Sequence, residues 1–304
     1  MIKITNIAKS DRQLKALTGL SIKEFDILLE SFTKILHEFL LANKNRQRAL
    51  GGGRKGVLVD AKSKLFYILS YLKIYPTYDL AGFIFGVDRS RCCRWSNSLM
   101  PFLEQALGRT ITMPKRRISS IEELLDLCPD VKDLFLDGTE RRTQRPKKSK
   151  TRTKRYSGKK KMHARKNAII CDEKRRIVYV SPTKEGKIHD LQQIKKTGIL
   201  EHIPPDITLW VDKGYQGIKS ALKNGNQVMI PHKKPRGKSL SSEQKEENKT
   251  VSGIRIVVEH AINGVKRFGA MSNTYRNRKG QDDSMIHLCA SLWNFTYNTQ
   301  IAKN

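Results

Sequence analysis

The sequence predicts a protein in two parts, an all-helical N-terminal region followed by an α/β region built on a mixed sheet. Up to about residue 128, apolar side chains recur at the three- and four-residue spacing of amphipathic helices. From Asp130 onward, short β-like apolar runs alternate with helical segments in the order βββαβαβα, which suits a mixed sheet covered by helices. The expected domains are therefore residues 1–128 and 129–304.

The charge balance indicates a nucleic-acid partner. The chain has 59 Lys and Arg against 29 Asp and Glu, a formal net charge of +30, and a positive field of this size attracts polyanions. Small nucleic-acid packing proteins share such a charge, but they are short and poor in apolar residues. Here 38% of 304 residues are hydrophobic, which is enough for a sizeable core and about two domains.

The cysteines and the N-terminus predict a reducing, intracellular setting. No CxxC pair is present and the number of cysteines is odd, so neither a zinc site nor a disulfide framework is expected. The N-terminus lacks the apolar core of a signal peptide, and no apolar run reaches the length of a membrane span. We expect a soluble protein without a membrane partner, whose cysteines are small core residues: Cys92, Cys93, Cys128, Cys171 and Cys289.

Two helices and a glycine-rich segment are expected before residue 76. Ser21 and Glu24 have the spacing of a capping box in front of an amphipathic helix over residues 22–40. A second helix is predicted over residues 62–75, ended by Pro76. Between them, residues 51–56 read Gly-Gly-Gly-Arg-Lys-Gly. A flexible basic loop is favoured there over a phosphate cradle, because the spacing matches no phosphate-binding loop.

Residues 77–99 have the pattern of a helix-turn-helix. Two short helices flank the turn Gly86-Val87, Gly82 suits a close crossing of the two, and Asp88 can cap the second helix. The alternative is an ordinary helical hairpin with a basic face. In a chain this basic we favour a recognition helix, whose first turns present to DNA bases and phosphates the side chains Arg89, Arg91 and Arg94.

The α/β region contains a predicted hairpin, two further strands and three helices. The hairpin joins residues 167–172 to 176–181 through Glu173-Lys174, and the strands cover residues 207–212 and 227–230. Helices are expected at about 190–197, 241–268 and 282–301. Trp210 lies on a buried strand, where core packing is favoured over stacking on a base.

Residues 141–166 form a basic segment with fourteen Lys or Arg and no acidic residue. Such runs are usually solvated or disordered. Because this one directly follows Asp137-Gly138-Thr139-Glu140, we expect it to contact DNA phosphates beside an active site. Lys159, Lys160 and Lys161 are its expected contacts, and Tyr156 and His163 could stack or hydrogen-bond within it.

Three carboxylates are candidates for a metal site. Apolar runs at residues 131–136 and 207–211 each stop at an Asp, Asp137 and Asp212. A helix over residues 254–268 carries Arg255, Glu259 and Lys266 along one line at the edge of its apolar stripe. Two strand-end Asp residues and a helical Glu can converge on a pair of divalent cations. The alternatives are turn-forming Asp residues and a surface ladder of ion pairs.

These motifs together resemble a known family. The spacing Arg255-x3-Glu259-x6-Lys266 resembles the signature of bacterial insertion-sequence transposases with a DDE catalytic triad. Ser252 departs from that signature, which often has a Tyr three residues before the Arg. Further blocks are similar to the branch related to the PIF/Harbinger transposases: Asp137-Gly138-Thr139-Glu140, Tyr156-Ser157-Gly158-Lys159-Lys160, His189-Asp190 and Asp212-Lys213-Gly214-Tyr215.

The resemblance implies an RNase H-like fold with Asp137 on the first strand, Asp212 on the fourth and Glu259 on a following helix. It implies that these carboxylates are catalytic and bind Mg²⁺, or Mn²⁺ as a substitute, as two ions. Arg255 and Lys266 are then placed to hold the scissile strand by its phosphates. The pair His189-Asp190 could supply a secondary ligand or a general base, although a helix-start cap is favoured.

The expected function is that of a DNA transposase. It would bind the terminal inverted repeats of its own element and a target DNA, both double-stranded, and cleave and transfer strands, as a homodimer in the DNA complex. The alternatives are an RNase H-like nuclease without joining activity and a captured transposase kept as a DNA-binding regulator. The expected location is the cytoplasm, at the nucleoid, or the nucleus of a eukaryotic host.

Overall fold

The computed structural model describes residues 10–42, 56–110, 112–235, 237, 239–277 and 280–301. The chain divides into two compact units. The first comprises Met1–Met113, Lys266–Met271 and Ser291–Asn304, and the second comprises Pro114–Val265 and Ser272–Ala290. The division at residue 128 into a DNA-binding and a catalytic domain stays a prediction. The glycine-rich stretch of residues 51–55 lies outside the described residues.

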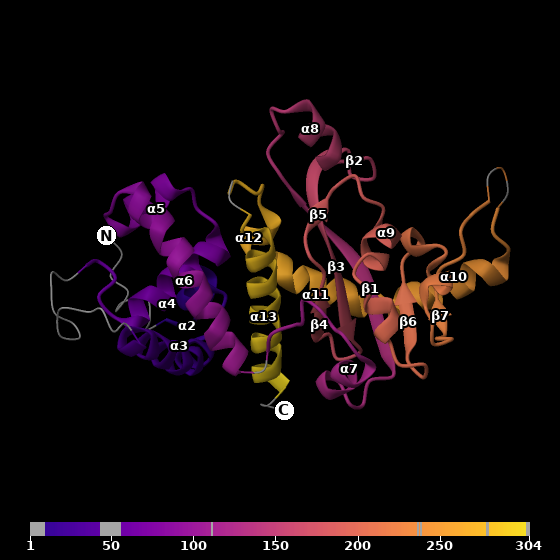
Figure 1. Cartoon of the computed structure of the whole chain (residues 1–304), viewed down its shortest axis with the longest axis horizontal. Coiled ribbons are helices and arrows are strands. Elements are labelled where there is room, and N and C mark those ends of the chain that lie inside the picture. Colours follow the sequence, from indigo (N-terminus) through magenta and orange to yellow (C-terminus); the bar gives the residue numbers. More distant parts are fainter. Residues whose placement is uncertain are drawn as a thin grey trace. The chain divides into compact units, whose positions relative to one another are not determined.

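Helices make up the first unit (Figure 1). The capping box in front of the helix that starts at Ile22 is confirmed. The Ser21 backbone N–H donates to Glu24 Oε2 at 2.7 Å, and the Glu24 N–H donates to Ser21 Oγ at 3.4 Å. The N-terminal elements are α2 (Asp11–Thr18), α3 (Ile22–Ala42), α4 (Ala61–Ile74), α5 (Tyr78–Phe85) and α6 (Arg89–Arg109). Short α12 (Gly269–Ser272) and long α13 (Asp282–Ile301) lie near the C-terminus.

Helix α4 is the core helix of this unit. Asp60 and Ser63 form its capping box, and Tyr75, with a φ of 53°, ends it directly before Pro76 as predicted. Every residue from Leu65 to Leu72 is buried. The hydroxyl of Tyr67 donates to the carbonyl of Cys92 at 2.8 Å, which ties α4 to the helix-turn-helix.

The helix-turn-helix is confirmed, with a longer second helix than the pattern predicted. Gly86 caps α5 in the left-handed conformation at φ 66°, and the Asp88 carboxylate accepts from the Ser90 N–H at 2.8 Å. Helix α6 continues to Arg109 through Pro101. A proline inside a helix costs a hydrogen bond, but residues on both sides of it, from Leu99 to Leu107, keep a buried apolar stripe. Packing against α3 and α4 therefore outweighs the break.

The second unit contains the mixed sheet that the sequence predicts. Its order is β2-β3-β1-β6-β7, and β4 and β5 also pair with β3. Strand β1 runs antiparallel to β3 and parallel to β6, and β6 runs parallel to β7. The strands are β1 (Asp133–Arg142), β2 (Tyr156–Ser157), β3 (Met162–Asp172), β4 (Ile177–Val180), β5 (Lys184–Glu185), β6 (Thr208–Val211) and β7 (Val228–Met229).

Helices and short 3₁₀ turns connect these strands. The predicted hairpin of β3 and β4 is present, and its turn is closed by the Arg176 N–H, which donates to Asp172 Oδ1 at 2.8 Å. Trp210 is 9% exposed and stacks on Phe135, so its predicted core role is confirmed. The connecting helices are α7 (Ile121–Leu127), α8 (Ser149–Arg155), α9 (Asp190–Lys195), α10 (Ser242–Ile254) and α11 (Ile256–Lys266), and the 3₁₀ turns are η1 (Ile199–His202), η2 (Lys213–Tyr215) and η3 (Ile218–Ala221).

Strand β1 corrects the prediction that a strand stops at Asp137. The strand continues to Arg142, because β3 pairs with it from Leu134 to Arg142. The apolar run ended earlier for a physical reason. Parallel pairing with β6 stops at Leu136, so the later part of β1 pairs with β3 on one side only. This part of the strand carries polar residues. Asp137 therefore lies in the middle of a strand.

The predicted helix over residues 241–268 is also corrected. It is interrupted at Arg255, which lies between α10 and α11. The expected apolar stripe fails at its start, because Ile254 is 38% exposed. From Val258 onward the stripe holds, and Ala261, Val265 and Phe268 are also buried. Helical periodicity alone could not show that a buried guanidinium would occupy the junction.

We predict that Gly82→Ala destabilises the helix-turn-helix unit. A Cβ at this position would lie 2.6 Å from the carbonyl oxygen of Val87, a backbone atom that cannot rotate away. The expected loss is roughly 1–3 kcal/mol in the free energy of unfolding, the cost of overpacking, measured by urea denaturation. Gly108→Ala is the matched control, because its Cβ meets only Met113 Sδ at 3.5 Å. Equal stability of the two variants would contradict the close approach.

Candidate active site

The register of two parallel strands brings Asp137 and Asp212 together. Leu136 on β1 pairs with Val211 on β6 at the end of their parallel ladder. Asp137 is the next residue along β1, and Asp212 directly follows the last residue of β6. Because parallel strands advance in the same direction, residues that follow a paired position lie at the same edge of the sheet. Two sequence segments 75 residues apart, 212 − 137, thereby contribute adjacent carboxylates.

Arg255 joins the two carboxylates through one guanidinium group. Its Nη2 lies 3.4 Å from Asp137 Oδ2 and its Nη1 lies 3.6 Å from Asp212 Oδ1. The arginine is 6% exposed, so the break between α10 and α11 carries a buried cation to the carboxylates. The sequence predicted a phosphate contact for Arg255. The structure shows it among the acidic groups, and its contact with DNA stays a prediction.

Burial controls the ionisation of Asp137. It raises the pKa of this carboxyl above its ordinary value, and the negative charge of Asp212 raises it further. The Gly138 N–H, which donates to Asp137 Oδ1 at 2.7 Å, and the cations Arg255 and Lys159 oppose this rise. Two crowded carboxylates favour any added positive charge, because it relieves their repulsion.

A further acidic residue, Asp190, belongs to the same cluster. Lys159 Nζ lies 3.7 Å from both Asp190 Oδ2 and Asp212 Oδ2. The buried Lys166 Nζ lies 3.0 Å from Asp190 Oδ1 and 3.2 Å from Glu140 Oε1. The favoured interpretation of His189 and Asp190 as a helix-start cap is wrong for their side chains. His189 occupies the N-cap position of α9 without a side-chain cap hydrogen bond, and the Asp190 carboxylate accepts from Lys166.

Gly214 leaves room for Asp190. A Cβ on Gly214 would lie 3.0 Å from Asp190 Oδ2, whereas a Cβ on Gly138 would make only ordinary van der Waals contact with Asp190 Oδ1, at 3.6 Å. The small residue in the block that follows Asp212 therefore has a steric reason. Sequence reasoning offered the pair His189-Asp190 as a secondary ligand or general base but favoured a helix cap, because only the fold brings α9 close to Asp137 and Asp212.

Tyr215 contributes a buried hydroxyl beside the acidic residues. The side chain is 1% exposed, and its hydroxyl has no hydrogen-bond partner among the described residues. Burial, reinforced by the charges of Asp137, Asp190 and Asp212, holds the pKa of this phenol well above its ordinary value. The phenol is therefore neutral and keeps a proton that it can donate.

Glu259 lies apart from this cluster. It is an exposed residue on α11, four positions after Arg255. Within the described part of the chain, no three His, Cys, Asp or Glu side chains are close enough to hold a metal ion. Asp137 and Asp212 fit a hard divalent cation by their donor chemistry, because their carboxylate oxygens are the ligands that Mg²⁺ and Mn²⁺ prefer. Glu259 as a third ligand stays a prediction.

The predicted DNA contacts occupy different environments. Arg89, Arg91 and Arg94 are exposed on α6, and Arg89 pairs with Asp79 at 3.5 Å. Lys160 and Lys161 are exposed in the turn before β3, whereas Lys266 is half-buried at the end of α11.

The described helices include none whose length and apolar character would allow it to span a membrane.

The basic segment of residues 141–166 is ordered and partly neutralised. It contributes the end of β1, α8, β2 and the start of β3. Arg141 and Arg165 pair with Asp282 at 2.6 and 3.6 Å, and Arg155 and Arg165 pair with Glu185 at 3.3 and 2.7 Å. The segment itself contains no acidic residue, but several of its cations are still paired, because acidic residues distant in sequence fold against it.

Comparison with known proteins identifies the family. Residues 136–294 match the DDE superfamily endonuclease family, and residues 57–109 match the helix-turn-helix of DDE superfamily endonuclease. The chain belongs to the DDE superfamily endonucleases. It is 29% identical over 284 residues, 93% of its own length and 94% of the relative's, to a protein of Microchaete diplosiphon described as a probable transposase for insertion sequence element IS702. No solved structure matches the chain significantly.

We predict that Arg255→Ala destabilises the second unit. The substitution leaves two adjacent carboxylates without their shared buried cation, and an uncompensated group of this kind costs roughly 1–3 kcal/mol. Adding Asp137→Asn should restore part of this loss, because it removes one of the repelling charges. Urea denaturation in the presence of a metal chelator measures both effects.

Lys223→Ala is the control for this measurement. Lys223 forms an exposed ion pair with Glu201 at 2.7 Å, and exposed pairs contribute about 0–1 kcal/mol. An Arg255→Ala variant no less stable than this control would show that the guanidinium does not balance the carboxylates.

Proposed function

We propose that this chain is a transposase that binds the terminal inverted repeats of its own element and catalyses metal-dependent cleavage and strand transfer. The observation that carries this proposal is the position of Asp137 and Asp212 directly after the last pair of the β1–β6 ladder, where both contact Arg255. Membership of the DDE superfamily endonucleases and likeness to a probable transposase over almost the whole chain support it.

The proposed metal ligands are Asp137, Asp212 and Glu259. DDE superfamily nucleases use divalent metals, and we propose two Mg²⁺ ions here, with Mn²⁺ as a substitute. When bound, such ions activate an attacking oxygen and stabilise the leaving oxygen of the phosphodiester. Of these three residues, Asp137 and Asp212 already lie close together, so they could bind a metal ion without a rearrangement of the sheet.

The cations of the cluster have separate tasks in this proposal. Arg255 is buried and keeps the two aspartates side by side before substrate arrives. Lys159 is more mobile, because its side chain is 57% exposed and its ion pairs are long, at 3.7 Å. It can exchange these carboxylates for a DNA phosphate and so hold the scissile strand. Tyr215 supplies a neutral phenol that can donate a hydrogen bond to a substrate oxygen.

DNA recognition is assigned to the helix-turn-helix. Helix α6 presents Arg89, Arg91 and Arg94 to solvent from its first turns, and arginine reads guanine edges and phosphates in the major groove. The proposed partners are double-stranded repeat and target DNA. A homodimer is proposed because two ends of an element must be joined together. The protein would act where the DNA is, at the nucleoid in the cytoplasm or in a nucleus.

Two other functions are compatible with the same fold. A nuclease without joining activity would use the same carboxylates and release the cut ends. A captured transposase acting as a regulator would bind DNA without cutting it. The complete set of candidate carboxylates argues against the regulator, because DNA binding alone has no chemical need for them.

We predict that Asp137→Ala, Asp212→Ala and Glu259→Ala each abolish strand cleavage and leave repeat binding nearly unchanged. Metal ligation and DNA recognition rest on different side chains, so the two activities should separate. Asp206→Ala, an exposed aspartate just before β6, is the matched control and should cleave normally. Cleavage is measured on labelled repeat DNA with Mg²⁺, and binding is measured on the same DNA with Ca²⁺.

A joining assay separates the three functions. Labelled repeat ends that are already cut are mixed with a target plasmid and Mg²⁺, and joined product is measured. A transposase joins these ends, a nuclease cleaves without joining and a regulator does neither. Joining by the Glu259→Ala protein would remove Glu259 from the site.

We also predict that Arg91→Ala or Arg94→Ala reduces the preference for repeat over random DNA. The expected effect is roughly 1–3 kcal/mol for each lost base contact, measured by competition binding. Arg109→Ala is the control on the same helix, because Arg109 lies at its far end and pairs with Glu38 at 2.6 Å. An equal loss in all three variants would indicate a general charge effect.

A further inference from the structure

A pocket of about 630 Å³ opens beside the catalytic cluster in the second unit. Its walls come from the loop before α8, from α8 itself, from the β2–β3 turn and from the segment after β5. Gly158 lines it, and the next residue is Lys159, whose Nζ lies 3.7 Å from Asp212 Oδ2. Two residues that are adjacent in sequence therefore lie at the pocket and at the carboxylates. No function assigned above uses this cavity.

An exposed aromatic ring forms the centre of the pocket. Tyr156 is 45% exposed and pairs with His163 in the β2–β3 ladder. The two rings meet edge to face, with centroids 5.6 Å apart. Despite this contact, much of the tyrosine side chain stays open to solvent. His163 Nδ1 is buried and has no hydrogen-bond partner in the described structure.

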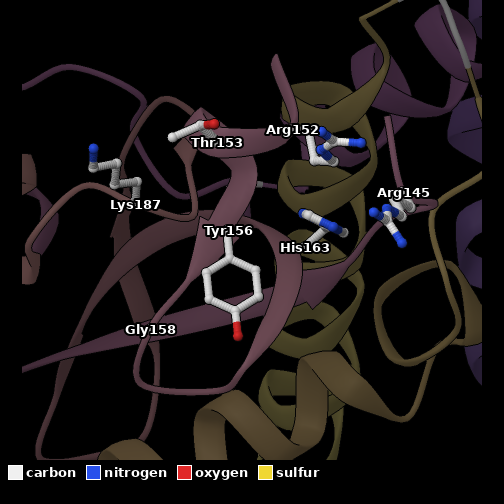
Figure 2. Close-up of a pocket in the computed structure, with 7 residues that line it drawn as sticks. All are labelled: Arg145, Arg152, Thr153, Tyr156, Gly158, His163 and Lys187. Carbon is white, nitrogen blue, oxygen red and sulfur yellow. The ribbon is translucent and has the colours of Figure 1, made fainter. Parts of the chain in front are cut away.

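Cations surround this ring. Figure 2 shows Arg145 and Arg152 together with His163 on one side of Tyr156, and Lys187 on the other side in this view. Within the described part of the chain Arg145, Arg152 and Lys187 form no ion pair, whereas Arg155, next to Tyr156 in sequence, is paired with Glu185 at 3.3 Å. The pocket thus combines an accessible ring with positive groups available for an anion.

This combination fits a nucleotide. Aromatic side chains stack on the faces of bases, and Lys and Arg hold the phosphates of a single strand. The faces of bases inside a duplex are covered by their neighbours, so only an unpaired nucleotide can offer its face to Tyr156. A free phosphate would use the cations and leave the ring unused.

We propose that this pocket binds one unpaired nucleotide of a DNA strand, with its base on Tyr156 and its phosphates at Arg145, Arg152 and Lys187. The proposal rests on the proposed function in DNA cleavage and adds a single-strand subsite next to the carboxylates. Its consequence is that DNA near the cut must be opened at one position, because the phosphate held by Lys159 and the base held by Tyr156 belong to neighbouring parts of one strand.

The test compares three labelled ligands on the full-length protein by fluorescence anisotropy. They are a single strand of about 12 nucleotides, within the range of single-strand sites, an abasic strand of the same length, and the duplex. Tyr156→Ala should weaken binding to the base-bearing strand about 5- to 100-fold, the range for one lost stacking contact. Its binding to the abasic strand and to the duplex should not change.

Further variants separate stacking from charge and from folding. Tyr156→Phe keeps the ring and should bind as the unchanged protein does, whereas Tyr156→Leu keeps the bulk and should lose as much as Tyr156→Ala. Lys187→Ala should weaken binding to both single strands. Lys174→Ala, an exposed lysine in the β3–β4 turn, should leave both unchanged.

The failures of the two proposals are distinguishable. If the unchanged protein binds the duplex and ignores the base-bearing strand, the nucleotide pocket is wrong and the proposed function stands. The pocket is also wrong if Tyr156→Ala and Tyr156→Leu bind the base-bearing strand normally, or lose equally on all three ligands. If the unchanged protein binds neither form of DNA, the proposed function itself fails.

Discussion

The parallel pairing of β1 with β6 is the constraint on which the candidate active site depends. Two apolar runs are drawn into the core by hydrophobic burial, and their ladder ends at Leu136 and Val211. The residue after each is an aspartate, so the force that builds the core also brings two like charges together. This arrangement is costly for the folded state, because both carboxylates would be more stable apart and in water. The rest of the cluster offsets that cost.

Compensation comes from three different elements. Arg255 reaches both aspartates from the junction of α10 and α11, Lys159 reaches Asp212 from the β2–β3 turn, and the Gly138 N–H donates to Asp137 from β1 itself. The helix is interrupted at Arg255, and the side chain of this residue is buried against the two aspartates instead of forming a solvent-facing ladder. A bound divalent cation would add to the same compensation, which is why the donor set and the charge balance favour one.

The basic residues of the chain have two roles, which the composition alone does not distinguish. Some cations are structural, such as Arg141 and Lys166, which are buried against Asp282, Glu140 and Asp190. Others remain exposed on α6 and around the pocket at Tyr156 and are available to a polyanion. The division follows from burial. A buried cation needs a partner to offset its lost hydration, whereas an exposed one does not.

The sequence by itself determined the elements whose signals are local. Helix periodicity, the Ser21–Glu24 capping box, the turn at Gly86 and the two Asp-ended apolar runs predicted the helix-turn-helix, the mixed sheet and the proximity of Asp137 and Asp212. Only the tertiary structure decided that β1 continues to Arg142, that the helix breaks at Arg255 and that Asp190 joins the cluster. It also decided which cations are neutralised, because each of these outcomes depends on residues far apart in the chain. Strand pairing and ion pairing over such separations leave no periodic trace in a sequence, so they become visible only when the chain is folded.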